Sequence, residues 1–139
     1  MKQLTHLLDT SVYSQRLRPQ PHPGVVQRWR SFGDQRLAIS AICEAELLYG
    51  LEKRQSARLW QEYHAALENA LTLLPIDKPT AGIYARLKAQ QEASGEPRAD
   101  FDLLIAATAL AHNLIVATGN PRHFVGLPGL VVEDWMEIF

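Results

Sequence analysis

The chain has 139 residues, of which 47% are hydrophobic and 21% are charged, and its formal net charge is −1. This length and composition fit one compact domain with a sizeable core, so we expect a single domain over residues 1–139. The near-neutral charge argues against a protein whose affinity for nucleic acid rests on broad phosphate neutralisation. The single cysteine, Cys43, excludes an internal disulfide framework and a multi-cysteine zinc site.

The amino-terminal segment lacks the long apolar core of a secretory signal, because Asp9 interrupts its only apolar run. No stretch of the sequence approaches the ~18 uninterrupted apolar residues that a membrane helix needs. We therefore expect a soluble, cytoplasmic protein with no membrane partner, and the sparse use of cysteine agrees with a reducing compartment.

Hydrophobic patterning predicts strands that alternate with helices along the chain. Short apolar runs predict strands at Leu4–Asp9, Leu37–Ile39, Leu73–Ile76, Leu114–Ala117 and Leu130–Val132. Apolar residues at helical spacing, or long apolar runs, predict helices at about Pro23–Arg30, Ala41–Arg54, Ser56–Ala70, Pro79–Gly95 and Asp100–His112. This alternation is typical of an α/β domain with a mostly parallel sheet.

Asp9 directly follows the first buried run and precedes two hydroxyl side chains, Thr10 and Ser11. In an open parallel sheet, ligands gather at the carboxyl ends of the strands, which is where these three residues would lie. A carboxylate in this position is also well suited to capping a following helix. The segment by itself leaves a catalytic role and a capping role equally open.

Asp102 falls in the first turn of the most apolar helix, for which Asp100 is the expected N-cap. Helical spacing puts Ile105, Ala106 and Ala109 on the same face as Asp102. A carboxylate on such a face is costly to bury unless it is paired or binds a metal ion. An acid at a helix start also interacts favourably with the helix dipole without any further function. The alanine-rich surroundings favour function, because they let another backbone or an ion approach.

Two glutamates of the segment 41–54, Glu44 and Glu46, point to nearly opposite sides of the predicted helix. Small and apolar residues lie on both sides, so helix geometry alone does not choose between them. A polar loop, Thr118 to Asn120, follows the run 114–117 and is placed to line the same crevice as Asp9.

Converging carboxylates without a histidine or cysteine cluster suit a hard cation such as Mg²⁺ or Mn²⁺. Such an ion stabilises charge that develops on a phosphate and activates water for in-line attack. Hydrolysis of a phosphodiester is therefore the reaction class that the pattern favours.

Three segments, in this order and spacing, resemble the motifs of the PIN-domain family: LLDTSVYS with Asp9, ISAICEAELLYGLEK with Glu46, and ADFDLLIAATALAHNLIVATGN with Asp102 and Asn120. The ending PRHFVGLPGLVVEDW is similar to the carboxyl end of VapC-type toxins, and the resemblance spans nearly the whole chain. It implies a three-layer α/β/α PIN fold and an endoribonuclease that depends on Mg²⁺ or Mn²⁺. It also implies a VapB-type antitoxin that occludes the site, a homodimer, and transfer RNA as the substrate.

The resemblance assigns the metal-site and catalytic acids to Asp9, Glu46 and Asp102, and the match of AELLYG selects Glu46 over Glu44. The supporting polar residues are expected to be Thr10, Ser11, Asp100, Thr118 and Asn120. Candidates for binding the RNA backbone are Arg16, Arg18, Arg122 and His123.

The chain departs from the family pattern in the last motif. Many relatives have an acid in or just after the loop that here runs from Thr118 to His123, and this chain has none there. A catalytically silent PIN domain that acts as an interaction module is therefore the alternative function.

Two other α/β folds that bear a functional aspartate fit poorly. A haloacid-dehalogenase-type phosphatase would have a second aspartate two residues after Asp9, where Ser11 stands. A response-regulator receiver would have a late lysine, and no lysine follows Lys88.

Overall fold

Five short parallel strands form one sheet in a computed structural model that describes residues 3–138. The strands are β1 His6–Leu8, β2 Leu37–Ser40, β3 Thr72–Leu74, β4 Ile115–Thr118 and β5 Val132–Asp134. They are ordered β3-β2-β1-β4-β5, and Leu7 in the central strand stands opposite Ala38 and Val116. Because all neighbouring pairs are parallel, the carboxyl ends of β1 and β4 lie side by side at one edge of the sheet.

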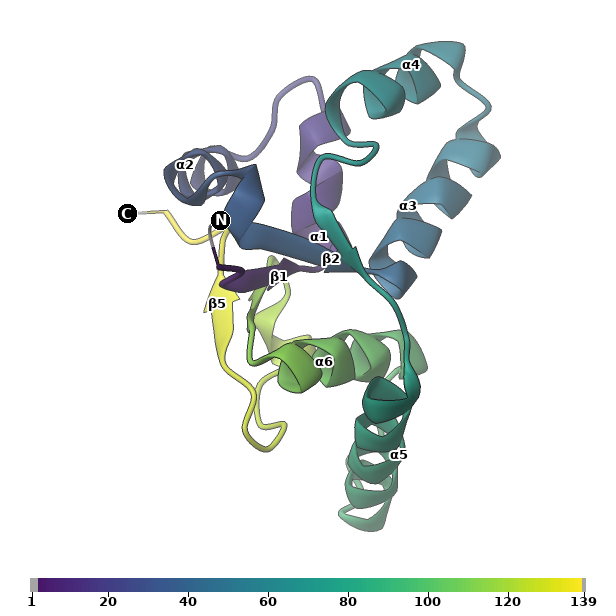
Figure 1. The fold of residues 1–139 in the computed structure, drawn as a ribbon, viewed down its shortest axis with the longest axis vertical. Coiled ribbons are helices and arrows are strands. Elements are labelled where there is room, and N and C mark those ends of the chain that lie inside the picture. Colours follow the sequence, from purple (N-terminus) through teal and green to yellow (C-terminus); the bar gives the residue numbers. More distant parts are fainter. Residues whose placement is uncertain (1–2, 139) are drawn as a thin grey trace.

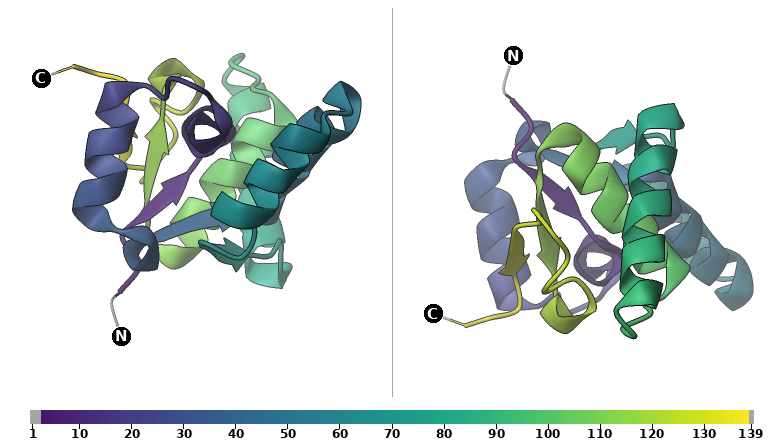
Figure 2. Two further views of the ribbon diagram at one scale, coloured as in Figure 1. Left: turned by 90° about the horizontal axis from the view of Figure 1, so that it is seen from above. Right: turned by 90° about the horizontal axis from the view of Figure 1, so that it is seen from below.

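Helices cover both faces of this sheet. They are α1 Thr10–Tyr13, α2 Pro23–Phe32, α3 Ala41–Arg54, α4 Ala57–Ala66, α5 Lys78–Ala93 and α6 Asp100–His112, with short 3-10 turns η1 Ser14–Leu17, η2 Asp34–Arg36 and η3 Pro121–His123. Helices α1 to α4 lie on one side of the strands, and α5 and α6 lie on the other (Figures 1 and 2). The three-layer α/β/α fold expected from the sequence is thus confirmed.

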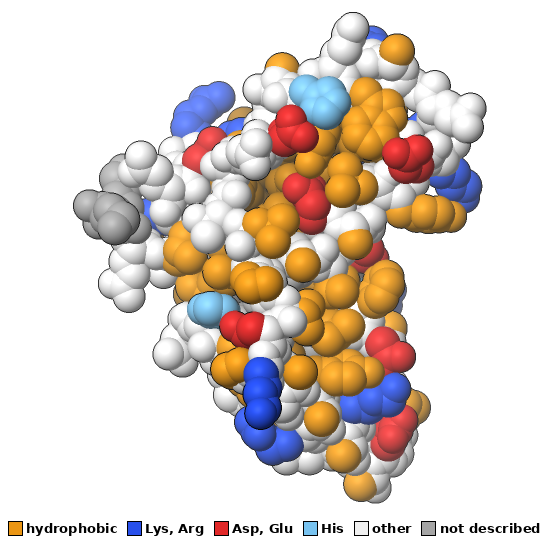
Figure 3. Space-filling model, turned by 45° about the vertical axis from the view of Figure 1, so that its right-hand side comes forward, with side chains coloured by type: hydrophobic (Ala, Val, Ile, Leu, Met, Phe, Trp, Pro, Cys, Tyr) orange, Lys and Arg blue, Asp and Glu red, His pale blue; other side chains and the backbone are white. Residues whose placement is uncertain are grey.

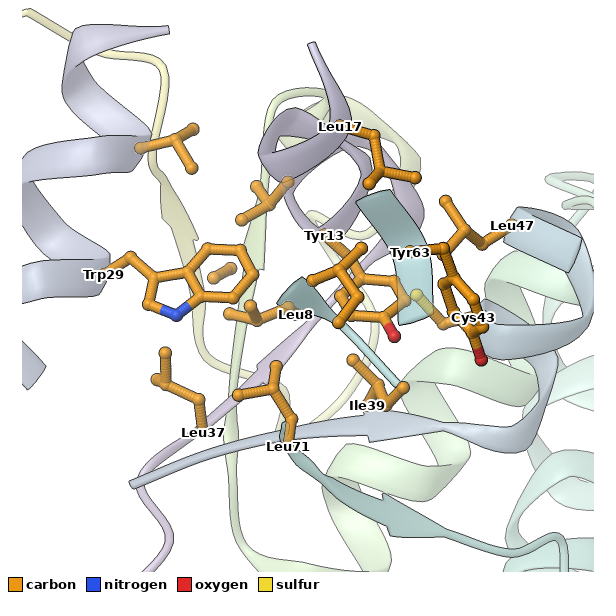
Figure 4. Close-up of a cluster of buried hydrophobic side chains, with 14 of the residues drawn as sticks. Leu8, Tyr13, Leu17, Trp29, Leu37, Ile39, Cys43, Leu47, Tyr63 and Leu71 are labelled. Atoms are coloured by element: carbon orange, nitrogen blue, oxygen red, sulfur yellow. The ribbon is translucent and has the colours of Figure 1, made fainter. Parts of the chain in front are cut away.

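Alternate residues of the strands bury themselves in two separate cores, as the strand period of two requires. Leu8 and Ile39 belong to the core under α1 to α4, which Figure 4 shows, whereas Leu7, Ala38 and Val116 belong to the core under α5 and α6. Strands that are apolar on both faces are typical of a parallel sheet between two helical layers. No helix within residues 3–138 is long and apolar enough to cross a membrane.

Side-chain caps fix where several helices begin. The Ser40 hydroxyl accepts a hydrogen bond from the Cys43 backbone N–H at 3.1 Å, so α3 begins directly after β2. Ser56 caps α4 in the same way, and Asp77 caps α5. The predicted helices over Ala41–Arg54 and Asp100–His112 are confirmed at both ends.

Several predicted boundaries and one predicted cap differ from the structure. The strand predicted over Leu73–Ile76 ends at Leu74, because Pro75 has no N–H to donate to a neighbouring strand. The strand predicted over Leu130–Val132 starts at Val132, after a turn in which Gly129 has a φ of +78°. The helix predicted over Ser56–Ala70 ends at Ala66, and Asn69 then takes a positive φ of 61°.

Asp100 is not the N-cap of α6, contrary to the sequence-based expectation. Ala99 occupies the cap position, and no side chain accepts a hydrogen bond there. The Asp100 carboxylate instead accepts from Lys88 Nζ at 2.8 Å and from the Tyr84 hydroxyl at 2.8 Å. A pairing between α5 and α6 has thus replaced the local cap, and Lys88 holds the pKa of Asp100 below its ordinary value.

Candidate active site

Asp9 stands at the carboxyl end of the central strand and is 6% exposed. Its carboxylate accepts hydrogen bonds from the Ser11 hydroxyl at 2.5 Å, from the Thr118 hydroxyl at 2.6 Å and from the Val12 backbone N–H at 3.3 Å. Burial raises the pKa of Asp9, and these hydrogen bonds oppose that rise. The bond from Val12 makes Asp9 the N-cap of α1, so the capping role foreseen for it is confirmed and accounts for one lone pair of the carboxylate.

A closed network of hydrogen bonds joins the loop after β1 to the loop after β4. The Ser11 hydroxyl donates to Asp9 and accepts from the Gly119 backbone N–H at 2.9 Å. The Thr118 hydroxyl likewise donates to Asp9 and accepts from the Asn120 backbone N–H at 2.9 Å. Ser11 and Thr118 therefore orient the carboxylate, whereas the contribution of Asn120 to this network comes from its backbone.

Glu44 and Glu46 of α3 have different partners. The Thr10 hydroxyl donates to Glu46 at 2.6 Å, which ties Glu46 to the residue next to Asp9. Glu44 accepts from the hydroxyls of Tyr13 at 3.2 Å and Tyr63 at 3.0 Å. Glu44 thus links α1, α3 and α4 within the fold, whereas Glu46 is tied to the residue next to Asp9 and stays the predicted site acid.

The pKa of the buried Cys43 thiol reflects the acids that surround it. Burial raises the pKa of its thiol far above the ordinary range, and the charges of Asp9, Glu46 and Glu44 raise it further. A thiol whose pKa is raised in this way is a poor nucleophile.

Asp102 lies in the first turn of α6, with its side chain 25% exposed. Its burial raises its pKa, while the charges of His123 and Arg98 lower it. His123 Nδ1 lies 3.5 Å from the Asp102 carboxylate, and the His123 backbone N–H donates to Asn120. Asp102 is thus connected to the turn that follows Thr118, although no hydrogen bond within residues 3–138 joins it directly to Asp9 or Glu46.

The carboxylate oxygens of Asp9 and Glu46 are donors that suit a hard divalent cation. Neither Asp9 nor Glu46 forms an ion pair with a basic residue in the described part of the chain, so the buried charge of Asp9 lacks a cationic partner. An oxygen-bound cation would supply that partner. As the side chains stand, no three Asp, Glu, His or Cys residues among those described form a closed cage, so closure around an ion requires side-chain movement.

The basic residues singled out from the sequence lie in three different settings. Arg16 is held in the fold, because it pairs with Asp34 at 3.1 Å and lies 4.2 Å over the Trp29 ring. Arg122 and His123 are exposed on η3, beside Asp102 in the case of His123. Arg18 lines a cavity of about 470 Å³ together with Thr10 and Glu46.

Arg54 and Arg58 line the same cavity and were missed by sequence reasoning. A basic residue in the last turn of a helix, such as Arg54, is favoured by the helix dipole alone and so does not indicate a binding role. Arg54 and Arg58 lie on either side of the junction between α3 and α4, and this spacing was the available signal. The direction in which their side chains face depends on how α4 folds back against α3.

Comparison with known proteins places this geometry in a family. The model of the PIN domain matches residues 6–127. Toxin FitB of Neisseria gonorrhoeae is 36% identical over 135 residues, covering 93% of this chain and 97% of that protein. The tRNA(fMet)-specific endonuclease VapC of Shigella flexneri is 29% identical, covering 95% and 98%. The crystal structure of DNA-bound VapBC from Salmonella typhimurium superposes with a TM-score of 0.82 at 29% identity, covering 95% of this chain and 98% of that one.

The chain belongs to the PIN domain family. Within that family, its similarity to VapC and FitB proteins runs over nearly its whole length, which confirms the resemblance to VapC-type toxins drawn from its motifs.

Proposed function

We propose that the chain is a divalent-metal-dependent endoribonuclease and the toxin half of a VapBC-type toxin–antitoxin pair, acting in the cytoplasm. The observation that carries this proposal is the Asp9 carboxylate, which is buried at the carboxyl end of β1, oriented by two hydroxyls and without a basic partner among the described residues. The similarity to proteins named ribonucleases and endonucleases supports RNA as the substrate. The alternative of a silent interaction module is not favoured, because proteins similar to this chain over nearly its whole length are named as endonucleases and ribonucleases.

Asp9, Glu46 and Asp102 would hold Mg²⁺ or Mn²⁺, whose charge stabilises the phosphate in the transition state and activates the attacking water. The protein's own groups would prepare that chemistry. Ser11 and Thr118 hold both Asp9 oxygens in place, and Thr10 holds one oxygen of Glu46. The Ser11 and Thr118 hydroxyls accept from the backbone N–H groups of Gly119 and Asn120, so the Asp9 carboxylate is oriented before an ion binds.

Partner and substrate are inferred from the relatives. A relative named for cleavage at tRNA(fMet) makes transfer RNA the first substrate to test. Similarity to the toxin in a VapBC complex bound to DNA supports a VapB-type antitoxin as the partner. We also expect a homodimer, as the resemblance to VapC toxins implies.

Cleavage of total tRNA by the purified protein tests the proposal. We expect discrete fragments with Mg²⁺ or Mn²⁺, none with EDTA, and none from the variant Asp9→Asn. Glu52→Gln is the matched control, because Glu52 is an exposed acid on the same helix as Glu46. Metal-independent cleavage, or full activity in Asp9→Asn, would contradict the proposed mechanism.

A further inference from the structure

A cavity of about 470 Å³ lies between η1, α3 and α4, and Thr10 and Glu46 form part of its wall. The cavity therefore opens onto the residues that position the proposed metal site. Its ionisable lining residues are Glu46 and three arginines, Arg18, Arg54 and Arg58. The lining thus carries a positive balance in a chain whose overall formal charge is −1.

Two of these guanidinium groups are unpaired in the described part of the chain. Arg18 and Arg54 are exposed, and their side chains form no hydrogen bond or ion pair with residues 3–138. Arg58 pairs with Glu62 at 2.8 Å, one turn along α4, but both side chains are largely open to water, so this pair is weak and readily exchanged. The cavity therefore presents cations that are available to a ligand.

Two other arginines have guanidinium groups that are bound by residues of the same chain. Arg16 is fixed by Asp34 and Trp29, and Arg98 donates to the carbonyls of His123 at 3.0 Å and Val125 at 2.6 Å. Arg18 and Arg54 lack such partners, as do the exposed Arg30, Arg86 and Arg122, but Arg18 and Arg54 line a cavity whose wall includes Glu46. Charged groups on long side chains that face a concave surface without a protein partner are suited to an anionic ligand.

We propose that Arg18, Arg54 and Arg58 bind consecutive phosphate groups of the RNA strand on one side of the scissile bond, and so guide the strand to Asp9 and Glu46. Guanidinium groups bind phosphate through two parallel hydrogen bonds, which gives position as well as affinity. A strand that is cut at the site must continue into neighbouring space, and this cavity is continuous with Glu46. The proposal rests on the ribonuclease function proposed above.

This assignment also explains how a slightly acidic protein would bind a polyanion. On the face shown in Figure 3, Lys and Arg side chains lie in separate groups and not in one continuous patch. Recognition would then be local, through the few phosphates nearest the scissile bond. The contribution of each arginine to binding should fall with salt in the manner of single-strand phosphate contacts.

The test replaces the arginines with glutamine, singly and together, and uses Lys53→Gln as the matched control. Lys53 is an exposed cation next to Arg54 on α3 that does not line the cavity. We expect each arginine variant to raise KM for tRNA roughly fivefold with little change in kcat, as for partly exposed charge-assisted contacts. Lys53→Gln should leave KM unchanged, and thermal unfolding should be the same for all variants.

A binding measurement separates this inference from the function on which it rests. In the Asp9→Asn background, a fluorescent single-stranded RNA is titrated at several salt concentrations. Each arginine replaced should reduce the slope of log K against log salt by roughly 0.7. If the slope and KM stay at the wild-type values in the triple variant, the inference is wrong even when the wild-type protein cleaves RNA.

Two further outcomes are informative. If the wild-type protein does not cleave RNA but binds it with this arginine-dependent slope, the ribonuclease proposal fails, whereas the assignment of RNA phosphate binding to these arginines stands. If a polyglutamate peptide binds in an arginine-dependent way while RNA binding does not depend on the arginines, the cavity binds an acidic protein segment and the inference is overturned.

Discussion

The Thr118 hydroxyl is the contact whose removal tests the account of Asp9 most sharply. Thr118 is fully buried, donates to Asp9 Oδ2 at 2.6 Å and accepts from the Asn120 N–H at 2.9 Å. Thr118→Val keeps the shape of the side chain and removes both hydrogen bonds. A hydrogen bond to a charged group contributes about 1.5–3 kcal/mol, so we expect the free energy of unfolding to fall by about 2 kcal/mol at neutral pH. For a chain of this size that corresponds to a decrease in Tm of roughly 6 °C.

The pH dependence of this loss shows whether the Thr118 hydroxyl stabilises the ionised form of Asp9. The folded state raises the pKa of Asp9 above the ordinary value of 3.8, so ionisation of Asp9 makes folding less favourable as pH rises through the folded pKa. The Thr118 hydroxyl opposes that effect by stabilising the ionised form. The destabilisation caused by Thr118→Val should therefore be largest near neutral pH and shrink on acidification below the folded pKa of Asp9.

Thr108→Val provides the matched control, because Thr108 is also fully buried but donates to the neutral Leu104 carbonyl at 2.8 Å. We expect it to cost about 1 kcal/mol at every pH. Urea denaturation of the wild-type protein and both variants, from about pH 7 to about pH 4, is the assay. Equal losses in the two variants, or a loss in Thr118→Val that does not change with pH, would refute the assigned role of Thr118.

Three further predictions follow from the same contacts. Mn²⁺ at a hundredfold excess over its Kd should stabilise the wild-type protein by about 2.7 kcal/mol in thermal unfolding, with the gain lost on acidification and in Asp9→Asn; stabilisation that persists in this variant would place the ion elsewhere. Glu44→Gln should lower the pKa of Tyr63 from about 12 in a spectroscopic titration, while leaving metal-dependent cleavage intact; an unchanged pKa would mean that burial alone sets it. Gly119→Ala should destabilise the protein by no more than about 1 kcal/mol, because the new Cβ would lie 2.6 Å from Sδ of the flexible Met136 side chain, which can shift. Additivity with Met136→Ala would contradict this cause, since relief of the clash makes the double variant more stable than the sum predicts.

The sequence predicted best those elements whose signals are local. Helices α3 and α6 begin and end where periodicity and composition place them, and Ser40, a residue type common at N-caps, caps α3. The four-residue helix α1 was not foreseen, because it is too short to show a helical period, although Asp9 as its cap was recognised as an alternative.

Contacts between distant segments could not be predicted. Asp100 was expected to cap a helix, but a lysine on another helix binds it instead. The network at Asp9 joins residues more than a hundred positions apart, and only the parallel pairing of β1 with β4 brings them together. The same holds for Glu44, whose two tyrosine partners come from α1 and α4 and reveal that its role is structural.

The last strand shows how one distant contact sets a register. The pattern of apolar residues favoured a strand ending at Val132, whereas β5 runs to Asp134. In this register Glu133 lies 2.8 Å from the buried His6 of β1 and accepts from the Trp135 indole at 3.1 Å. Trp135 is then fully buried, so burial of an aromatic side chain and pairing of a buried histidine together outweigh the local apolar pattern.

The Mn²⁺ dependence of tRNA cleavage, measured for Asp9→Asn, Glu46→Gln, Asp102→Asn and Glu44→Gln beside the wild-type protein, tests the central claim most directly. The account predicts that each of the first three variants loses cleavage or needs far more Mn²⁺, while Glu44→Gln responds to Mn²⁺ as the wild-type protein does. A wild-type response in any of the first three variants, or cleavage that needs no metal ion, would contradict the claim that these three carboxylates together form the catalytic metal site.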